Sequence, residues 1–198
     1  MTPLLVALAL SGPLANPLPG GFVAGYAADT GLDIAGYLLP VRSIAAGTVE
    51  YAERGHTRWR GKADSPYSIR VRLDAPIPWR GRRITHAYYG HLSQLAVSKP
   101  EGSEGTLRVE AGELLGTSGF ANGAPHLHLG LLLDDETSQD WGTYLVESEI
   151  REVLGGLRPK TRLGPGKWLS AAFGDASSRA ASELSPSTWR RAAPPIFG

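Results

Sequence analysis

The chain has 198 residues, with 20 Lys and Arg against 19 Asp and Glu, which gives a formal net charge of +1. This length suffices for one sizeable hydrophobic core, and the near-neutral charge gives no electrostatic basis for binding nucleic acid. The lack of cysteine excludes a disulfide framework and a thiolate metal site. The 25 Gly and 15 Pro residues favour a turn-rich β protein over a helix bundle.

The first fifteen residues are mostly apolar or small. Residues 3–10 are too few to span a bilayer, so we expect no stable membrane span. They are long enough for the apolar region of a signal peptide, although no Lys or Arg precedes Arg42. Residues 1–15 are therefore interpreted either as a signal peptide of an exported protein or as an N-terminal strand buried against the domain.

A β-rich region follows. Residues 17–21 predict a stiff turn, and residues 36–49 alternate apolar residues with turns, with a hairpin corner at Ala46-Gly47. Residues 53–66 are polar and basic and predict an exposed loop. Residues 68–73 alternate cleanly between apolar and polar, which predicts a half-buried strand.

The next breaks and strands are predicted from Pro, Gly and apolar runs. Pro76, Pro78 and Gly81 are expected to break the chain before a second strand at 84–89, which runs into His91. Later elements are a charged loop at 99–105, a short strand between Gly112 and Gly116, and a strong strand at 127–133.

The C-terminal third has a different composition. Residues 144–154 carry apolar residues at helical spacing and predict a short amphipathic helix, which Gly155-Gly156 should end. From Arg158 onward Pro, Gly, Ser, Ala and Arg dominate, so we expect a loosely ordered tail with a short helix at 176–184. Its tryptophans are expected to pack on the domain, with contact to a partner as the alternative; they are Trp168 and Trp189.

Two histidines suggest the chemistry of the chain. His126 and His128 lie two apart in a strand-like run, so both should point to one face while Leu127 and Leu129 point into a core. Paired imidazoles on a sheet surface suggest a metal site, because histidine is the commonest metal ligand. A polar face exposed to water is the alternative for this pair taken alone.

Two further segments accompany this pair. Gly31 to Gly36 contains Asp33, and Tyr89-Gly90-His91-Leu92 contains the second histidine motif. With the third motif, His126-Leu127-His128, they resemble in order the lysostaphin-type zinc endopeptidases, the cell-wall-cutting family of the LytM domain. The resemblance covers roughly residues 16–133. It implies a mostly β fold, an antiparallel sheet or barrel-like sandwich with a groove, plus a short C-terminal helix and an irregular tail.

The chain departs from the family at the first metal ligand. The resemblance implies a histidine four residues before Asp33, and Asp29 stands there. The implied metal ligands are therefore Asp29, Asp33 and His128. His91 and His126 match the two family histidines that do not bind the metal but orient the water and stabilise the transition state.

The aspartate changes the expected properties of the site. Two carboxylates and a neutral imidazole leave a divalent cation with a formal site charge of zero, which should lower the pKa of bound water less than a site of charge plus one. Oxygen-rich sites also favour harder metals than zinc. The alternative is that Asp29 is a solvated turn residue and that metal binding has been lost.

Two histidines lie outside the motifs. His86 lies five residues before His91, so a regular strand would direct it to the opposite face, as a packed or surface residue. His56 lies in the basic loop and could supply the missing nitrogen ligand by moving into the site.

The sequence thus predicts one of two functions. The first is a metal-dependent endopeptidase with one Zn²⁺ or another divalent ion, acting on peptidoglycan peptides outside the cell or in its envelope. The second is a weakened or inactive module that binds cell wall or regulates another wall hydrolase. The predicted parts are an N-terminal apolar segment at 1–15, a peptidase-like domain at 16–135, and a helix and tail at 136–198 that could bind a protein partner.

Overall fold

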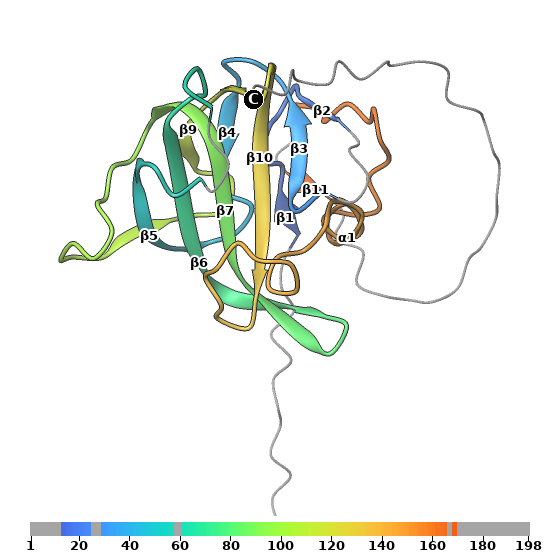
Figure 1. The fold of residues 1–198 in the computed structure, drawn as a ribbon. Coiled ribbons are helices and arrows are strands. Elements are labelled where there is room, and N and C mark those ends of the chain that lie inside the picture. The colour runs from blue at the N-terminus through green and yellow to red at the C-terminus, as the bar shows by residue number, and fades with distance from the viewer. Residues whose placement is uncertain (1–12, 25–28, 58–60, 166–167, 170–198) are drawn as a thin grey trace, which may run out of the picture.

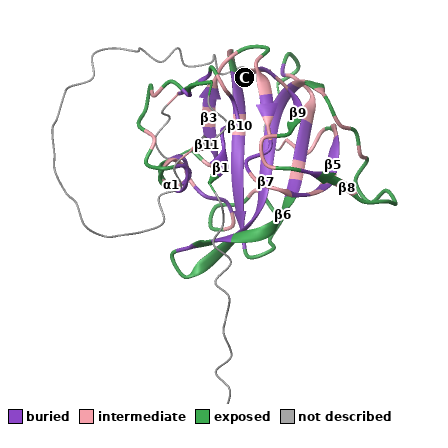
Figure 2. Cartoon of the chain, turned by 180° about the vertical axis from the view of Figure 1, so that it is seen from behind, coloured by how far each residue is buried: buried purple, intermediate pink, exposed green. Residues whose placement is uncertain are grey.

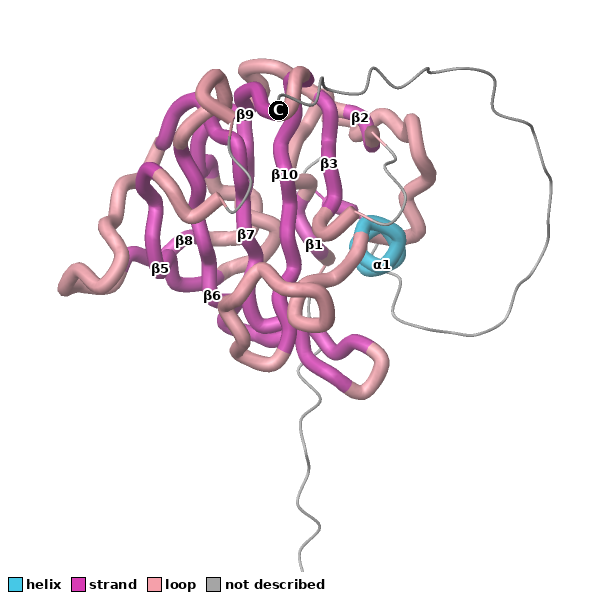
Figure 3. Tube along the Cα trace, in the orientation of Figure 1, coloured by secondary structure: helices cyan, strands magenta, loops and turns pink. Residues whose placement is uncertain are grey.

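The computed structural model describes residues 13–24, 29–57, 61–165 and 168–169. In this part of the chain nine strands form one sheet, two short strands form another, and a single short helix lies beside them (Figures 1 and 3). The strands are β1 (Leu14–Ala15), β2 (Phe22–Val23), β3 (Leu32–Ala35), β4 (Pro40–Arg42), β5 (Gly47–Arg54), β6 (Tyr67–Trp79), β7 (Arg82–Leu95), β8 (Leu107–Val109), β9 (Leu114–Ala121), β10 (Ala124–Leu133) and β11 (Trp168–Leu169), and the helix is α1 (Glu147–Val153).

Every named strand pairing is antiparallel, which confirms the predicted mostly β fold class. β10 runs through the middle of the main sheet, between β3 and β7 (Figure 1). The predicted strands at 68–73, 84–89 and 127–133 lie inside β6, β7 and β10. No described helix is long and apolar enough to cross a membrane.

The hairpin between β6 and β7 corrects one expectation. Pro76 and Pro78 lie within β6 and do not end it. They are tolerated because β5 pairs with β6 only as far as Leu73, so this part of β6 is an edge. The chain turns instead at Arg80 and Gly81, which have φ angles of 45° and 80°, as a tight two-residue hairpin turn requires.

Two other strand boundaries also differ from the sequence prediction. Ala46-Gly47 is not a hairpin corner, because β4 pairs with β9 while β5 pairs with β6 and β8. Gly116 does not end a strand but lies within β9. A Cβ atom at Gly116 would meet the carbonyl oxygen of Gln94, so this glycine permits close approach of β7 rather than marking a turn.

The predicted helix forms, although it is shorter than 144–154. Glu147–Val153 is helical, and Gly155, with a φ angle of 93°, follows its C-terminal end. Ile150 and Val153 pack into the same hydrophobic cluster as the core-facing leucines of β10, and the central strands of the sheet are largely buried (Figure 2). Residues 1–12, the helix predicted at 176–184 and Trp189 lie outside the described residues.

A partly buried ion pair outside the site gives a prediction for stability. Arg70 Nε donates to one Glu50 oxygen at 2.5 Å, and His86 Nε2 lies 3.3 Å from the other. The hydrogen bond to His86, with those of Arg70, outweighs burial and lowers the pKa of Glu50 from 4.5 to about 2. The folded state therefore binds fewer protons than the unfolded state between these two values, so this contribution is lost as the pH falls from 4.5 to about 2.

We expect Glu50→Gln to lower the free energy of unfolding at pH 7 by about 1–2 kcal/mol, a figure discounted for the partial exposure of Glu50. The difference from wild type should shrink in acid. Urea denaturation at pH 7 and pH 3 measures it, with the exposed Glu104→Gln as the control. An equal loss at both pH values would show that the charge of Glu50 is not the cause.

Candidate metal and catalytic site

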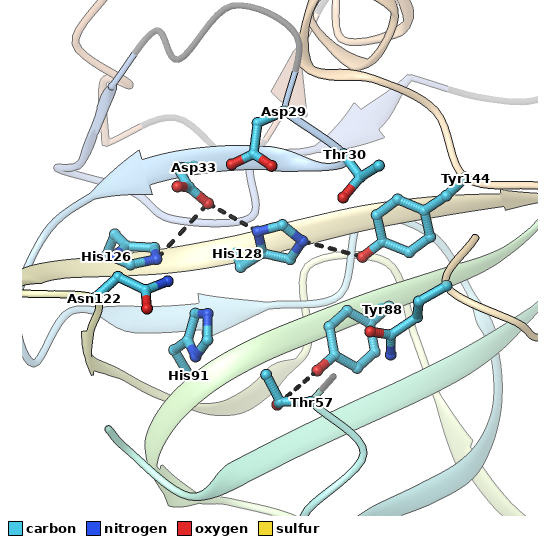
Figure 4. Close-up of a pocket in the computed structure, with 11 residues that line it drawn as sticks. Asp29, Thr30, Asp33, Thr57, Tyr88, His91, Asn122, His126, His128 and Tyr144 are labelled. Atoms are coloured by element: carbon cyan, nitrogen blue, oxygen red, sulfur yellow. Dashed lines mark hydrogen bonds and ion pairs between the residues drawn. The ribbon is translucent and has the colours of Figure 1, made fainter. Parts of the chain in front are cut away.

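The pairing of β3 with β10 brings two predicted ligands together. Asp33 lies directly opposite His128, and cross-strand partners in an antiparallel sheet share a face. Asp33 Oδ1 is 2.8 Å from His128 Nδ1 and 3.7 Å from His126 Nε2. The prediction that Asp33 and His128 share one sheet face is therefore confirmed (Figure 4).

His91 reaches this face through an irregularity in β7. In the register of β7 against β6, the three steps from Tyr89 to Leu92 lie opposite the two steps from Tyr67 to Ile69, so β7 carries an extra residue. His91 has a φ angle of 60°, which few non-glycine residues adopt. This bulge turns the His91 ring toward His126, with ring centroids 4.9 Å apart.

The same bulge corrects the expectation for His86. Alternation reverses across the extra residue, so His86 lies on the face of His128 and not on the opposite one: β7 pairs Gly90 with His128 and His86 with Leu132. His86 is buried far along the strand, where its ring nitrogens contact Thr85 and Glu50. It is a packed residue, as predicted.

A pocket opens over this part of the sheet (Figure 4). It brings all five predicted site residues together with residues from four other segments. Its lining consists of Asp29, Thr30, Asp33, Thr57, Tyr88, His91, Asn122, His126, His128, Gln139 and Tyr144.

The hydrogen bonds assign the protons on His128. Burial tends to raise the pKa of Asp33, but the hydrogen bond to His128 and the charges of the three site histidines outweigh it and lower the pKa. Asp33 is therefore a carboxylate, and His128 Nδ1 carries the proton that it accepts. The other nitrogen of His128, Nε2, lies 3.1 Å from the hydroxyl of Tyr144, which donates a hydrogen bond to it when Nδ1 carries the only ring proton.

His126 and His91 present nitrogen atoms to the pocket. His126 Nδ1 donates to the carbonyl oxygen of Ala124 at 3.0 Å, and its Nε2 lies toward Asp33. His91 is only 5% exposed, and its Nδ1 has no hydrogen-bond partner among the described residues. Burial, with the charges of His128 and His126, lowers the pKa of His91 to about 4, so this ring is neutral at pH 7.

Asp29 lies at the rim. Its carbonyl oxygen accepts a hydrogen bond from the backbone of Glu147, and the next residue, Thr30, forms a bridge with Val146. Its side chain is directed toward Asp33 and His128 in Figure 4. Burial and the nearby charge of Asp33 raise the pKa of Asp29. A bound cation would stabilise the charge of Asp29, which the neighbouring Asp33 carboxylate disfavours.

The residue types of the site suit a divalent cation, but the present distances between their donor atoms do not match a metal site. Two carboxylates and an imidazole are common ligands of zinc and of harder divalent ions, and His91 lines the same pocket. The described residues hold no group of three or more His, Asp or Glu side chains already spaced as a metal site. Asp33 and His128 are hydrogen-bonded at 2.8 Å, whereas two ligands of one zinc ion lie about 3–4 Å apart.

His56 does not supply the missing nitrogen. Its Nε2 lies 2.8 Å from Glu53, and its ring stacks on Tyr51 with centroids 3.9 Å apart. The ring does not line the site pocket, although the neighbouring Thr57 does. The alternative ligand considered from the sequence is therefore not supported by the structure.

The sequence analysis missed the polar residues that complete the pocket. Thr57, Asn122 and Gln139 lie in connections, and Tyr144 was counted with the C-terminal helix. Only Tyr144 left a signal in the sequence, because Gly130 interrupts the apolar run of β10. An isolated glycine inside a strand indicates close approach of another group, and the Tyr144 hydroxyl lies there.

Comparisons with known proteins give matches among solved structures alone. No family model matches the chain, and no curated protein matches it. The lysostaphin catalytic domain from Staphylococcus simulans is 21% identical, over 64% of this chain and 84% of that one, with a TM-score of 0.42. A putative M23 peptidase from Pseudomonas aeruginosa is 22% identical, over 62% of this chain and 46% of its own, with a TM-score of 0.41.

A third match is the catalytic domain of a mutant prophage-encoded M23 protein from Enterococcus faecalis. It is 20% identical, over 69% of this chain and 90% of that one, with a TM-score of 0.40. Lysostaphin and M23 peptidases are thus among the solved structures to which the chain is similar, as the resemblance of its three motifs predicts.

Proposed function

We propose that this chain is a metal-dependent endopeptidase that cuts peptides of bacterial peptidoglycan. The observation that carries the proposal is the pocket in which Asp33, His128, His126 and His91 meet on one sheet face. Asp29, Asp33 and His128 would hold one divalent cation, Zn²⁺ or a harder ion. The cation supplies a Lewis acid that polarises a carbonyl and lowers the pKa of water.

The remaining histidines have separate roles in this proposal. His126 accepts a proton from the attacking water at Nε2, and Asp33, 3.7 Å from that nitrogen, stabilises the resulting positive charge. His91 lines the pocket and is neutral at pH 7, and an N–H group of its ring would stabilise the oxyanion. Both rings are nearly buried, which strengthens these charge interactions.

The substrate class and the location rest on the motif resemblance. A peptidoglycan peptide implies work outside the cell or in its envelope. Thr57, which lines the pocket, would contact such a peptide. A protein partner of the C-terminal tail is a further proposal, as is the division at residues 15 and 135.

The spacing of the donors favours a second candidate function. Because no described group of three donors is spaced as a metal site, the chain could instead be a module that binds cell wall or regulates another hydrolase. Asp29, in place of the nitrogen ligand implied by the resemblance, is the residue that would have caused this loss.

Release of dye from labelled peptidoglycan distinguishes the two candidates. Wild type should release soluble fragments, and both a chelator and His128→Ala should abolish release, because each removes the cation. A matched assay of binding to cell wall should show that His128→Ala still folds. Wall binding by wild type without any release, even with added zinc or manganese, would favour the module.

A further inference from the structure

Tyr144 contacts the site from the segment that follows β10. Its hydroxyl lies 3.1 Å from His128 Nε2, and its ring stacks near-parallel to the His128 ring with centroids 6.1 Å apart. The side chain is buried in a small aromatic cluster with Tyr51, Tyr88 and Leu132. Burial raises the pKa of Tyr144 well above its usual value, so the phenol keeps its proton.

The chain leaves room for this contact at two glycines. A Cβ atom at Gly130 would collide with the hydroxyl and ring of Tyr144, and one at Gly31 would collide with the ring of His128. Gly130 lies in β10 and Gly31 directly precedes β3. A side chain at either position would exclude the contact between Tyr144 and His128. The hydrogen bond between Tyr144 and His128 therefore depends on a glycine beside each of the two rings.

The segment that carries Tyr144 also fixes the loop of Asp29. Leu145 accepts a hydrogen bond from the amide of Gly31 at 2.9 Å, and the amide of Glu147 donates to Asp29, also at 2.9 Å. Leu145 donates in turn to Leu131 of β10 at 3.0 Å. Residues 144–147 thus join the Asp29 loop to β10 directly beside His128.

We propose that Tyr144 is a positioning residue for His128. Its hydrogen bond to Nε2 fixes the rotation of the ring so that Nδ1 faces Asp33 and the pocket, and in the metal-free protein it favours, together with Asp33, the tautomer with the proton on Nδ1. A hydroxyl can donate to Nε2 or accept from it, so the contact persists whether Nδ1 carries a proton or gives it up. Outer hydrogen bonds of this kind orient metal-binding histidines. The relevance of this inference to catalysis rests on the proposed function, whereas the positioning of the His128 ring does not.

The test is Tyr144→Phe, which keeps the aromatic ring and removes only the hydroxyl. Tyr51→Phe makes the same change in the same cluster, away from the site pocket. In metal-free protein at a pH where His128 is neutral, the ¹⁵N shifts of wild type should report one tautomer with the proton on Nδ1. Tyr144→Phe should move them toward an average of the two tautomers, and Tyr51→Phe should not.

Unchanged His128 shifts in a folded Tyr144→Phe variant would overturn the proposal. If that variant does not fold, wild type alone decides: a scalar coupling between the Tyr144 hydroxyl proton and His128 Nε2 supports the proposal, and a rapidly exchanging hydroxyl overturns it. With zinc, Tyr144→Phe should bind roughly 10- to 100-fold more weakly than wild type. Because the tautomer is read without metal, failure of wild type to bind zinc would count against the proposed function alone.

Discussion

Replacing His91 with alanine is expected to remove most hydrolysis of peptidoglycan while leaving zinc binding nearly intact. His91 touches neither Asp33 nor His128 through a hydrogen bond, so the proposed ligands keep their geometry without it. In the proposed mechanism, its role is to stabilise charge on the reacting carbonyl or to move a proton. Such a group contributes roughly two to four orders of magnitude in rate.

The measurement combines dye release from cell wall with calorimetric zinc titration of the same preparation. His56→Gln is the matched control, because His56 pairs with Glu53 outside the pocket and should change neither quantity. Loss of zinc binding in His91→Ala would mean that His91 is a ligand. Full activity in the variant would remove it from the mechanism.

Changing Asp29 to histidine is expected to have the second large effect. It adds a nitrogen ligand and one unit of positive charge to the site, so zinc should bind more tightly and hydrolysis should rise. The change is in a direct ligand, so the gain should reach at least the roughly 10- to 100-fold that outer contacts produce. Asp29→Ala should act in the opposite direction and weaken binding.

The backbone near Asp29 makes this pair of variants informative. Asp29 is tied to the C-terminal segment by its carbonyl oxygen rather than by its side chain, so both substitutions should keep that link. Thermal unfolding checks this point. If Asp29→His changes neither zinc affinity nor hydrolysis, the assignment of position 29 to the site is wrong.

Local pattern was enough to predict the strands that carry the site. The alternation in residues 68–73 and the spacing of His126 and His128 are properties of a strand by itself, and both predictions hold in β6 and β10. The opposition of Asp33 and His128 followed from the motif resemblance. The sequence also predicted α1, because its apolar spacing and the glycines after it are local signals.

Features that depend on neighbouring strands could not be predicted in this way. The bulge at His91 appears only in the register of β7 against β6, and it reverses the face assigned to His86. Pro76 and Pro78 are tolerated because β5 stops short of them, which no local pattern reveals. Tyr144 joins the site through a segment that crosses back from β10 to the Asp29 loop.

Calorimetric titration of zinc into wild-type protein tests the central claim most directly. We predict one ion per chain, weaker binding by Asp29→Ala, and no binding by His128→Ala, which removes the nitrogen that lies 2.8 Å from Asp33. Absence of binding in wild type, with binding and cleavage restored by Asp29→His, would contradict it. The natural chain would then be a non-catalytic module built on the same pocket.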